Sequence, residues 1–161
     1  MKPLLVGESN PYGTDPHYAL YPAPIGCAGW RLCHEVLGLR DVTYLGSFER
    51  VNLLAGKWSV PAAREAAAAI RFRHEGDLTD PLRQTRPAII LLGRKVADAF
   101  EIHDHSPAPY VSMKHAPLTL VLLPHPSGLC RRWGAELDLV ERCREALRKV
   151  LPGIPFGEVG L

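Results

Sequence analysis

Short runs of almost exclusively apolar residues constrain the fold of this chain more than any other feature. The clearest runs occupy residues 4–6, 88–92 and 118–123, and a more polar run at 48–54 is a fourth candidate. A strand that is apolar along its whole length must be covered on both faces, which is the usual situation inside a parallel sheet. These runs therefore predict four strands of one parallel sheet.

Segments with helical spacing separate the apolar runs. Trp30, Cys33 and Leu37 recur at helical spacing before Gly38, a residue type that often follows the end of a helix. The alternation of strands and helices predicts an α/β fold, a three-layer α/β/α sandwich around a central four-stranded parallel sheet. In chain order, the predicted helices cover residues 30–37, 59–70, 93–100 and about 133–150.

The composition is that of a globular protein. With 161 residues, of which 47% are apolar and 22% charged, the chain can bury a core without metal or disulfide support, and we expect one domain over residues 1–161. No apolar run is long enough to span a bilayer. The four cysteines lack C-x-x-C spacing, so we expect reduced thiols in a cytoplasmic, monomeric protein with no membrane partner.

Two turns that follow buried strands carry polar side chains. The first reads GESNPYG (7–13) and the second LLPHPSGL (122–129). Ligands of parallel α/β sheets bind at the carboxyl ends of the strands, so we expect these distant turns to face one cleft. A net charge of only +2 neither requires nor excludes a nucleic acid in that cleft.

These turns resemble the two signature motifs of the uracil-DNA glycosylase superfamily, which read G-Q-D-P-Y-H, G-x-N-P-G or G-E-x-P-G, and H-P-S or N-P-S. The segments GCAGWRL (26–32) and RVNLLAGKWSVP (50–61) resemble two further segments of the iron–sulfur branch, in the same order. The resemblance covers most of the chain. It implies a monofunctional DNA glycosylase that hydrolyses the N-glycosidic bond of uracil or a related damaged base and leaves an abasic site.

The resemblance implies catalytic roles for His125 and Asn10. His125, as a neutral imidazole, would donate to the negative charge of the departing pyrimidine, as donors in an oxyanion hole do, and Asn10 would position water. The first turn has one residue more than G-x-N-P, so Glu8 or Asp15 could hold the water instead. A His before Pro could also bond a loop carbonyl, and Asn-Pro could simply form a turn.

The resemblance also implies a pocket for the base. Asn52 matches an Asn of the family that bonds the Watson–Crick edge, for which an amide offers both a donor and an acceptor, although it could instead bond backbone at a strand end. The stacking Phe of the family is replaced by Pro24, and Tyr12, Tyr18 or Tyr21 could substitute or only cover the core. The predicted base-binding residues are Asn52, Tyr12, Tyr21, Gly7 and Glu8.

The second turn and the residues after it would contact DNA. Leu129 stands where the family often carries a residue that wedges into the duplex, and Arg131 and Arg132 could hold phosphates. Ser127 could bond a phosphate or cap a helix. Acidic residues in the following helix offset the positive charge of these arginines. The alternative is therefore that this surface is a solvated face and does not bind DNA. The predicted DNA-binding residues are Ser127, Gly128, Leu129, Arg131 and Arg132.

We expect no metal and no cofactor. The cysteines that hold the cluster of the iron–sulfur branch are missing, and water is the nucleophile. The segment 101–117 is expected to be an excursion loop, and its adjacent His103, Asp104 and His105 seldom converge on a metal without distant ligands. The altered first motif leaves two alternatives on the same fold: a nucleotide-processing relative, or a nucleic-acid-binding module, in either case without uracil-excision activity.

Overall fold

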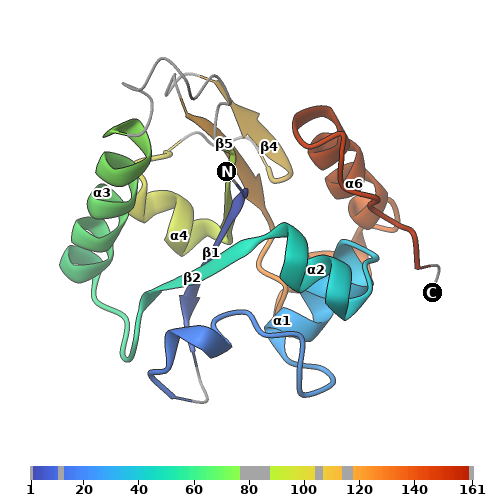
Figure 1. The fold of residues 1–161 in the computed structure, drawn as a ribbon, viewed down its shortest axis with the longest axis horizontal. Coiled ribbons are helices and arrows are strands. Elements are labelled where there is room, and N and C mark those ends of the chain that lie inside the picture. The colour runs from blue at the N-terminus through green and yellow to red at the C-terminus, as the bar shows by residue number, and fades with distance from the viewer. Residues whose placement is uncertain (1, 11–12, 77–87, 104–106, 114–117, 160–161) are drawn as a thin grey trace.

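The structure of the protein is a computed structural model that describes residues 2–10, 13–76, 88–103, 107–113 and 118–159. Within these residues, five strands form one open, mostly parallel sheet in the order β2-β1-β3-β5-β4 (Figure 1). The strands are β1 (Leu4–Ser9), β2 (Glu49–Leu54), β3 (Ala88–Leu92), β4 (Tyr110–Ser112) and β5 (Thr119–Leu123).

The α/β class and the four parallel strands expected from the apolar runs are confirmed. β1 pairs in parallel with β2 and with β3, and β3 pairs in parallel with β5. Every residue of β3 and β5 is buried, whereas β2, which lies at one edge, is half-buried at most positions. The unbroken apolar runs thus mark the interior strands, and the more polar run marks an edge.

The prediction of a four-stranded parallel sheet is wrong in one respect. A fifth strand, β4, lies antiparallel to β5, with Val111 opposite Val121, inside the segment that we expected to be a loop. An edge strand pairs on one side only and can be very short, so a three-residue strand between prolines leaves no apolar run in the sequence.

The helices differ from the predictions in their bounds. The predicted final helix is divided in two at Glu136, whose carboxylate accepts hydrogen bonds from Arg132 and Arg142; these lower the pKa of Glu136 to about 2. A short helix after residue 40 was not predicted. The helical segments are η1 (Pro16–Tyr18, a 3₁₀ turn), α1 (Ala28–Trp30), η2 (Arg31–Val36, a π-helix), α2 (Asp41–Ser47), α3 (Val60–Gly76), α4 (Arg94–Ala99), α5 (Arg132–Ala135) and α6 (Leu139–Val150).

Helices pack against both faces of the sheet (Figure 1). α3 and α4 cover the face that carries Val6, Ile89 and Leu120, and the opposite face, which carries Leu5 and Ile90, packs against η2, α2 and α6. This alternation of side chains is what each interior strand requires. None of the helices in the described part of the chain has the length and apolar character needed to cross a membrane.

The loop between β1 and α1 is tied to the rest of the fold by backbone acceptors. The hydroxyl of Tyr44 in α2 donates to the carbonyl oxygen of Leu20 at 2.8 Å, and Arg50 in β2 donates to that of Ala19 at 2.9 Å. A Cβ on Gly29 would lie 2.2 Å from the carbonyl oxygen of Tyr21, so only glycine lets α1 approach this loop so closely. These contacts fix the loop that follows the first polar turn.

We expect Tyr44→Phe to destabilise the protein by about 1–2 kcal/mol, because the buried ring stays packed while the Leu20 carbonyl loses its donor. The free energy of unfolding in urea, followed by circular dichroism, measures the change. Tyr18→Phe, at an exposed ring, is the matched control and should alter stability by less than about 0.5 kcal/mol. Equal stability of Tyr44→Phe and the unchanged protein would contradict this role.

Candidate active site

Four parallel strands end at the same edge of the sheet, and the polar residues of interest follow them there. Asn52 lies near the end of β2, Gly7 and Glu8 near the end of β1, and Gly93 and His125 follow β3 and β5. The strand order therefore brings the two polar turns to one edge, with β3 between them. This is where sheets of this kind bind ligands.

Three contacts hold His125, two at its side chain and one at its backbone carbonyl. It packs on Gly93, whose φ is +93° and where a Cβ would lie 3.1 Å from the Cβ of His125. The backbone N–H of Ser127 donates to Nδ1 at 3.1 Å, and the indole N–H of Trp133 donates to the His125 carbonyl oxygen at 2.7 Å. Because Nδ1 accepts a hydrogen bond, the neutral ring carries its proton on Nε2.

Nε2 of His125 faces the carboxylate of Glu8, with 3.9 Å between Nε2 and Oε1. Both side chains are partly exposed, at 30% and 26%, so they line an open site. Burial lowers the pKa of His125, the Glu8 charge raises it, and the Lys95 charge lowers it, with a net fall below the usual value. The imidazole is therefore neutral at pH 7 and presents a donor.

Asn52 occupies space that a glycine leaves open. Gly7 pairs with Asn52 across β1 and β2, and a Cβ on Gly7 would lie 2.4 Å from Oδ1 of Asn52. Any larger residue at Gly7 would push the amide away. The structure thus gives a physical reason for the glycine that opens the first polar turn.

Two small cavities, of about 50 and 80 Å³, share Asn10 and Asn52 in their walls. The structure therefore brings together these two predicted site residues. Asp15 lines the second cavity, where its carboxylate accepts the backbone N–H of His17 at 2.9 Å and caps η1. This cap accounts for Asp15 without a catalytic role.

Aromatic rings line the first cavity. Tyr18 and Tyr21 meet edge to face at 5.5 Å between ring centroids, and the guanidinium of Arg50 lies 5.6 Å from the centre of the Tyr21 ring. Tyr21 is half-buried and contacts Arg50, whereas Tyr18 is 53% exposed. Tyr12 lies outside the described residues, so Tyr18 and Tyr21 are the aromatic residues that the described part of the chain offers to a base.

His125 does not line either of these cavities. Together with Arg94, Cys130 and Arg132 it lines a third cavity of about 210 Å³. Glu8 is the link between the two groups, because it faces His125 and stands two residues before Asn10 in the chain. The site thus consists of a His–Glu pair next to a small cavity with two amides and two tyrosines.

Some of the predicted DNA-binding residues are exposed, whereas others are engaged in contacts within the protein. Leu129 is 92% exposed and Arg131 is exposed, whereas the guanidinium of Arg132 donates to Glu136 at 2.7 and 3.1 Å and to the carbonyl oxygen of Ala108. The backbone N–H of Ser127 is used to orient His125.

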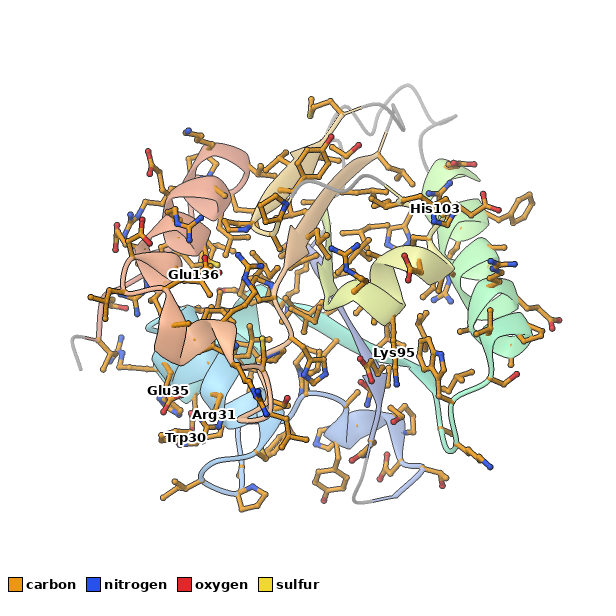
Figure 2. All side chains as sticks on the ribbon, turned by 180° about the vertical axis from the view of Figure 1, so that it is seen from behind. Trp30, Arg31, Glu35, Lys95, His103 and Glu136 are labelled. Carbon is orange, nitrogen blue, oxygen red and sulfur yellow. The ribbon has the colours of Figure 1, made fainter. Side chains whose placement is uncertain are left out.

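Gly128, the remaining predicted DNA contact, packs against the guanidinium of Arg31, where a Cβ would lie 3.3 Å from a terminal nitrogen. Arg31 also bonds Glu35 at 3.1 Å and the Gly26 carbonyl oxygen at 3.2 Å, and Figure 2 shows Arg31 and Glu35 side by side. Arg31 therefore connects the second polar turn to the loop before α1.

Three residues that contact or influence His125 were missed from the sequence: Gly93, Lys95 and Trp133. Gly93 had a signal, because a glycine directly after a buried strand often marks a close approach of another group. Lys95 had none, because it is distant from His125 in the sequence, and the spacing of Trp133, eight residues after His125, does not indicate a contact.

One group of possible metal ligands occurs among the described residues. The ligand atoms of Cys33, His34 and Asp41 lie within 4.8 Å of one another. These side chains already bond one another and the nearby backbone. Nε2 of His34 lies 2.8 Å from the carboxylate of Asp41, and the Cys33 thiol donates to the Leu39 carbonyl oxygen at 3.3 Å. Burial and Asp41 raise the pKa of Cys33 to about 12, which favours the thiol over the thiolate that a metal needs.

His103, the described member of the histidine pair in the segment 101–117, lies 3.9 Å from the carboxylate of Asp98. Asp104 and His105 fall outside the described residues. Both His103 and Asp98 are exposed.

No protein-family model matches the chain, and a search of curated proteins finds no matching sequence. The resemblance to uracil-DNA glycosylases therefore depends on the sequence motifs alone and is a hypothesis about function.

We expect Gly93→Ala to destabilise the protein by more than about 1 kcal/mol and to displace the His125 ring. Alanine is strained at a φ of +93°, and its Cβ would crowd the Cβ and Cδ2 atoms of His125. Urea unfolding and the NMR shifts of the His125 ring measure both effects. Gly46→Ala, in α2 with open space around it, is the control and should be neutral or stabilising; an unshifted His125 ring in Gly93→Ala would contradict the packing argument.

We expect Lys95→Met to raise the pKa of His125. Removing a positive charge near the ring makes its protonated form less unfavourable, and the effect should shrink in high salt. An NMR titration of the ring protons gives the value, with Lys149→Met in α6 as the control. A pKa that stays constant or falls in Lys95→Met would show that this charge does not act on the ring.

Proposed function

We propose that the protein is a DNA glycosylase that hydrolyses the N-glycosidic bond of uracil or a related damaged base in DNA and leaves an abasic site. The observation that carries the proposal is the neutral His125, oriented by the Ser127 N–H so that Nε2–H points toward Glu8 at the carboxyl edge of the sheet. The pairing of this imidazole with the two signature-like turns supports base-excision chemistry in preference to a binding role alone.

His125 would act as an electrophile. When the glycosidic bond breaks, the departing pyrimidine carries negative charge, and a fixed N–H donor in a partly buried site stabilises that charge. Because burial and Lys95 favour the neutral imidazole, it would stabilise the anion by donating a hydrogen bond from Nε2–H without transferring the proton. A general acid would need the protonated ring, which this environment disfavours.

Glu8 and Asn10 are the candidates for holding the water. A carboxylate next to the site stabilises the positive charge that develops on the sugar and can accept a proton from water, whereas an amide only positions it. Glu8 faces the imidazole, and Asn10 lines the cavity with Asn52. We assign the proton acceptor to Glu8 and the positioning of water to Asn10.

Asn52, Tyr18 and Tyr21 would hold the base. The amide reads the edge of the ring, and a tyrosine contributes stacking of about 1–3 kcal/mol. The cavity of about 50 Å³ is small beside a nucleobase, so a base would enter only if the walls, which include the exposed Tyr18, moved apart. The glycosylase would therefore close around a flipped base rather than receive it in a preformed pocket.

The exposed residues of the second turn would contact the duplex. The exposed Leu129 would fill the space that a flipped base leaves, and the exposed Arg131 would meet a phosphate. In this proposal the helices on both faces of the sheet form the three-layer α/β/α sandwich, and the protein is a cytoplasmic monomer that needs no cofactor or metal.

The proposal predicts that the protein releases uracil from a uracil-containing oligonucleotide, which alkali then cleaves at the abasic site. His125→Ala should lower the single-turnover rate by about 10²–10³-fold, the usual loss for one donor of this kind. Asn52→Ala should mainly weaken substrate binding. Excision should fall with rising salt because phosphate contacts release counterions.

The same assay separates the two water candidates. Glu8→Gln should lower the rate if a carboxylate accepts the proton, and Asn10→Ala should lower it if the amide positions water. Arg73→Gln, at the exposed far end of α3, is a control that should react at the normal rate. An oligonucleotide left intact with uracil, hypoxanthine, xanthine and hydroxymethyluracil would contradict the proposed activity.

A further inference from the structure

A cavity of about 280 Å³ between α3 and α4 is not used by the chemistry described above. Side chains of the loop after β2, of the first turn of α3 and of α4 form its walls. The lining residues are Trp58, Val60, Ala63, Arg64, Lys95, Asp98 and Ala99.

The cavity adjoins the candidate active site. Trp58 follows β2 and Lys95 follows β3, and β1, which carries Glu8, lies between these two strands. Lys95 belongs to both places: it lines the cavity, and its charge acts on His125. Figure 2 shows Lys95 reaching from α4 beside the end of β1. A ligand in the cavity would therefore lie next to the His–Glu pair.

The walls combine a flat aromatic ring with positive charge. The ammonium of Lys95 lies 5.7 Å from the centre of the half-buried Trp58 ring. Arg64 is the fifth residue of α3, a helix of 17 residues whose positive end adds to these two charges. An indole suits a nucleobase, and two cations beside a helix start suit a phosphate.

Asp98 is the acidic residue of the lining. It lies on α4, where its carboxylate faces His103 at 3.9 Å. Its charge repels a phosphate, so we expect the phosphate near Arg64 and Lys95 rather than near Asp98.

We propose that this cavity holds a nucleotide of a single-stranded DNA segment, next to the nucleotide whose base enters the candidate active site. The base stacks on Trp58, and its phosphate lies near Arg64 and Lys95. That the bound strand is also the reacting strand rests on the proposed glycosylase function; binding of the nucleotide itself does not.

Binding of a short single-stranded oligothymidylate tests the subsite. Trp58→Ala should weaken binding about 5- to 150-fold, the loss of one stacked base, whereas Trp58→Phe should keep most of the affinity. Trp30→Phe, on the opposite side of the sheet, is the matched control and should bind like the unchanged protein. Fluorescence anisotropy of a labelled oligothymidylate measures all four affinities.

Tryptophan fluorescence gives a readout that does not depend on a folded alanine variant. Oligothymidylate should quench the emission of the unchanged protein and of Trp30→Phe, and this quenching should be lost in Trp58→Phe. Quenching that persists unchanged in Trp58→Phe would overturn the subsite.

The positive charges are tested through salt. Arg64→Gln should weaken binding and reduce the slope of log K against log salt by about 0.7, the value for one phosphate contact on a single strand. Arg73→Gln, in the last turn of the same helix, should leave the slope unchanged. Equal slopes for Arg64→Gln and the unchanged protein would contradict a phosphate at Arg64.

The binding and excision assays distinguish failure of the subsite proposal from failure of the glycosylase proposal. If oligothymidylate binds and Trp58→Ala weakens it while no uracil is released, the subsite stands and the glycosylase proposal falls. If uracil is released but Trp58→Ala binds as tightly as the unchanged protein, the subsite falls and the glycosylase proposal stands. Absence of binding by the unchanged protein overturns the subsite, whatever the excision assay shows.

Discussion

The parallel pairing of β1 and β5 with β3 is the constraint on which the candidate site depends. Because all three strands run in the same direction, their carboxyl ends lie at one edge, and the turns that follow β1 and β5 meet across Gly93. The interior positions of these strands are apolar and buried, so a shift of register would expose core residues. The position of His125 beside Glu8 is therefore maintained by the same packing that stabilises the sheet.

Around this edge, small residues create the space that polar groups need. Gly93 admits the His125 ring and Gly7 admits the Asn52 amide, while Ser127 supplies only its backbone N–H to orient the imidazole. Environment then sets the charge of the ring: burial and Lys95 favour the neutral form against the opposing influence of Glu8. A neutral donor, a carboxylate and two amides at one edge are the groups that the proposed hydrolysis requires.

The sequence predicted well the features that depend on local pattern, and less well those that depend on distant partners. Apolar runs located the interior strands, and the motif residues Asn10 and Asn52 line common cavities. Strand β4 was missed because three residues carry no periodicity. The division of the last predicted helix was missed because Glu136 is extended there and pairs with Arg142, a contact that helical spacing does not reveal.

By itself, the sequence determined the α/β class, the interior strands and the two polar turns that follow β1 and β5, because burial on both faces and turn formation are encoded in consecutive residues. The tertiary structure alone decided which polar groups face one another. The approach of Nε2 of His125 to Glu8, the influence of Lys95 on that ring, and the hydrogen bond from Arg132 to the carbonyl oxygen of Ala108 all join separate elements. Such contacts exist only once the sheet has brought distant segments together, so residue spacing could not supply them.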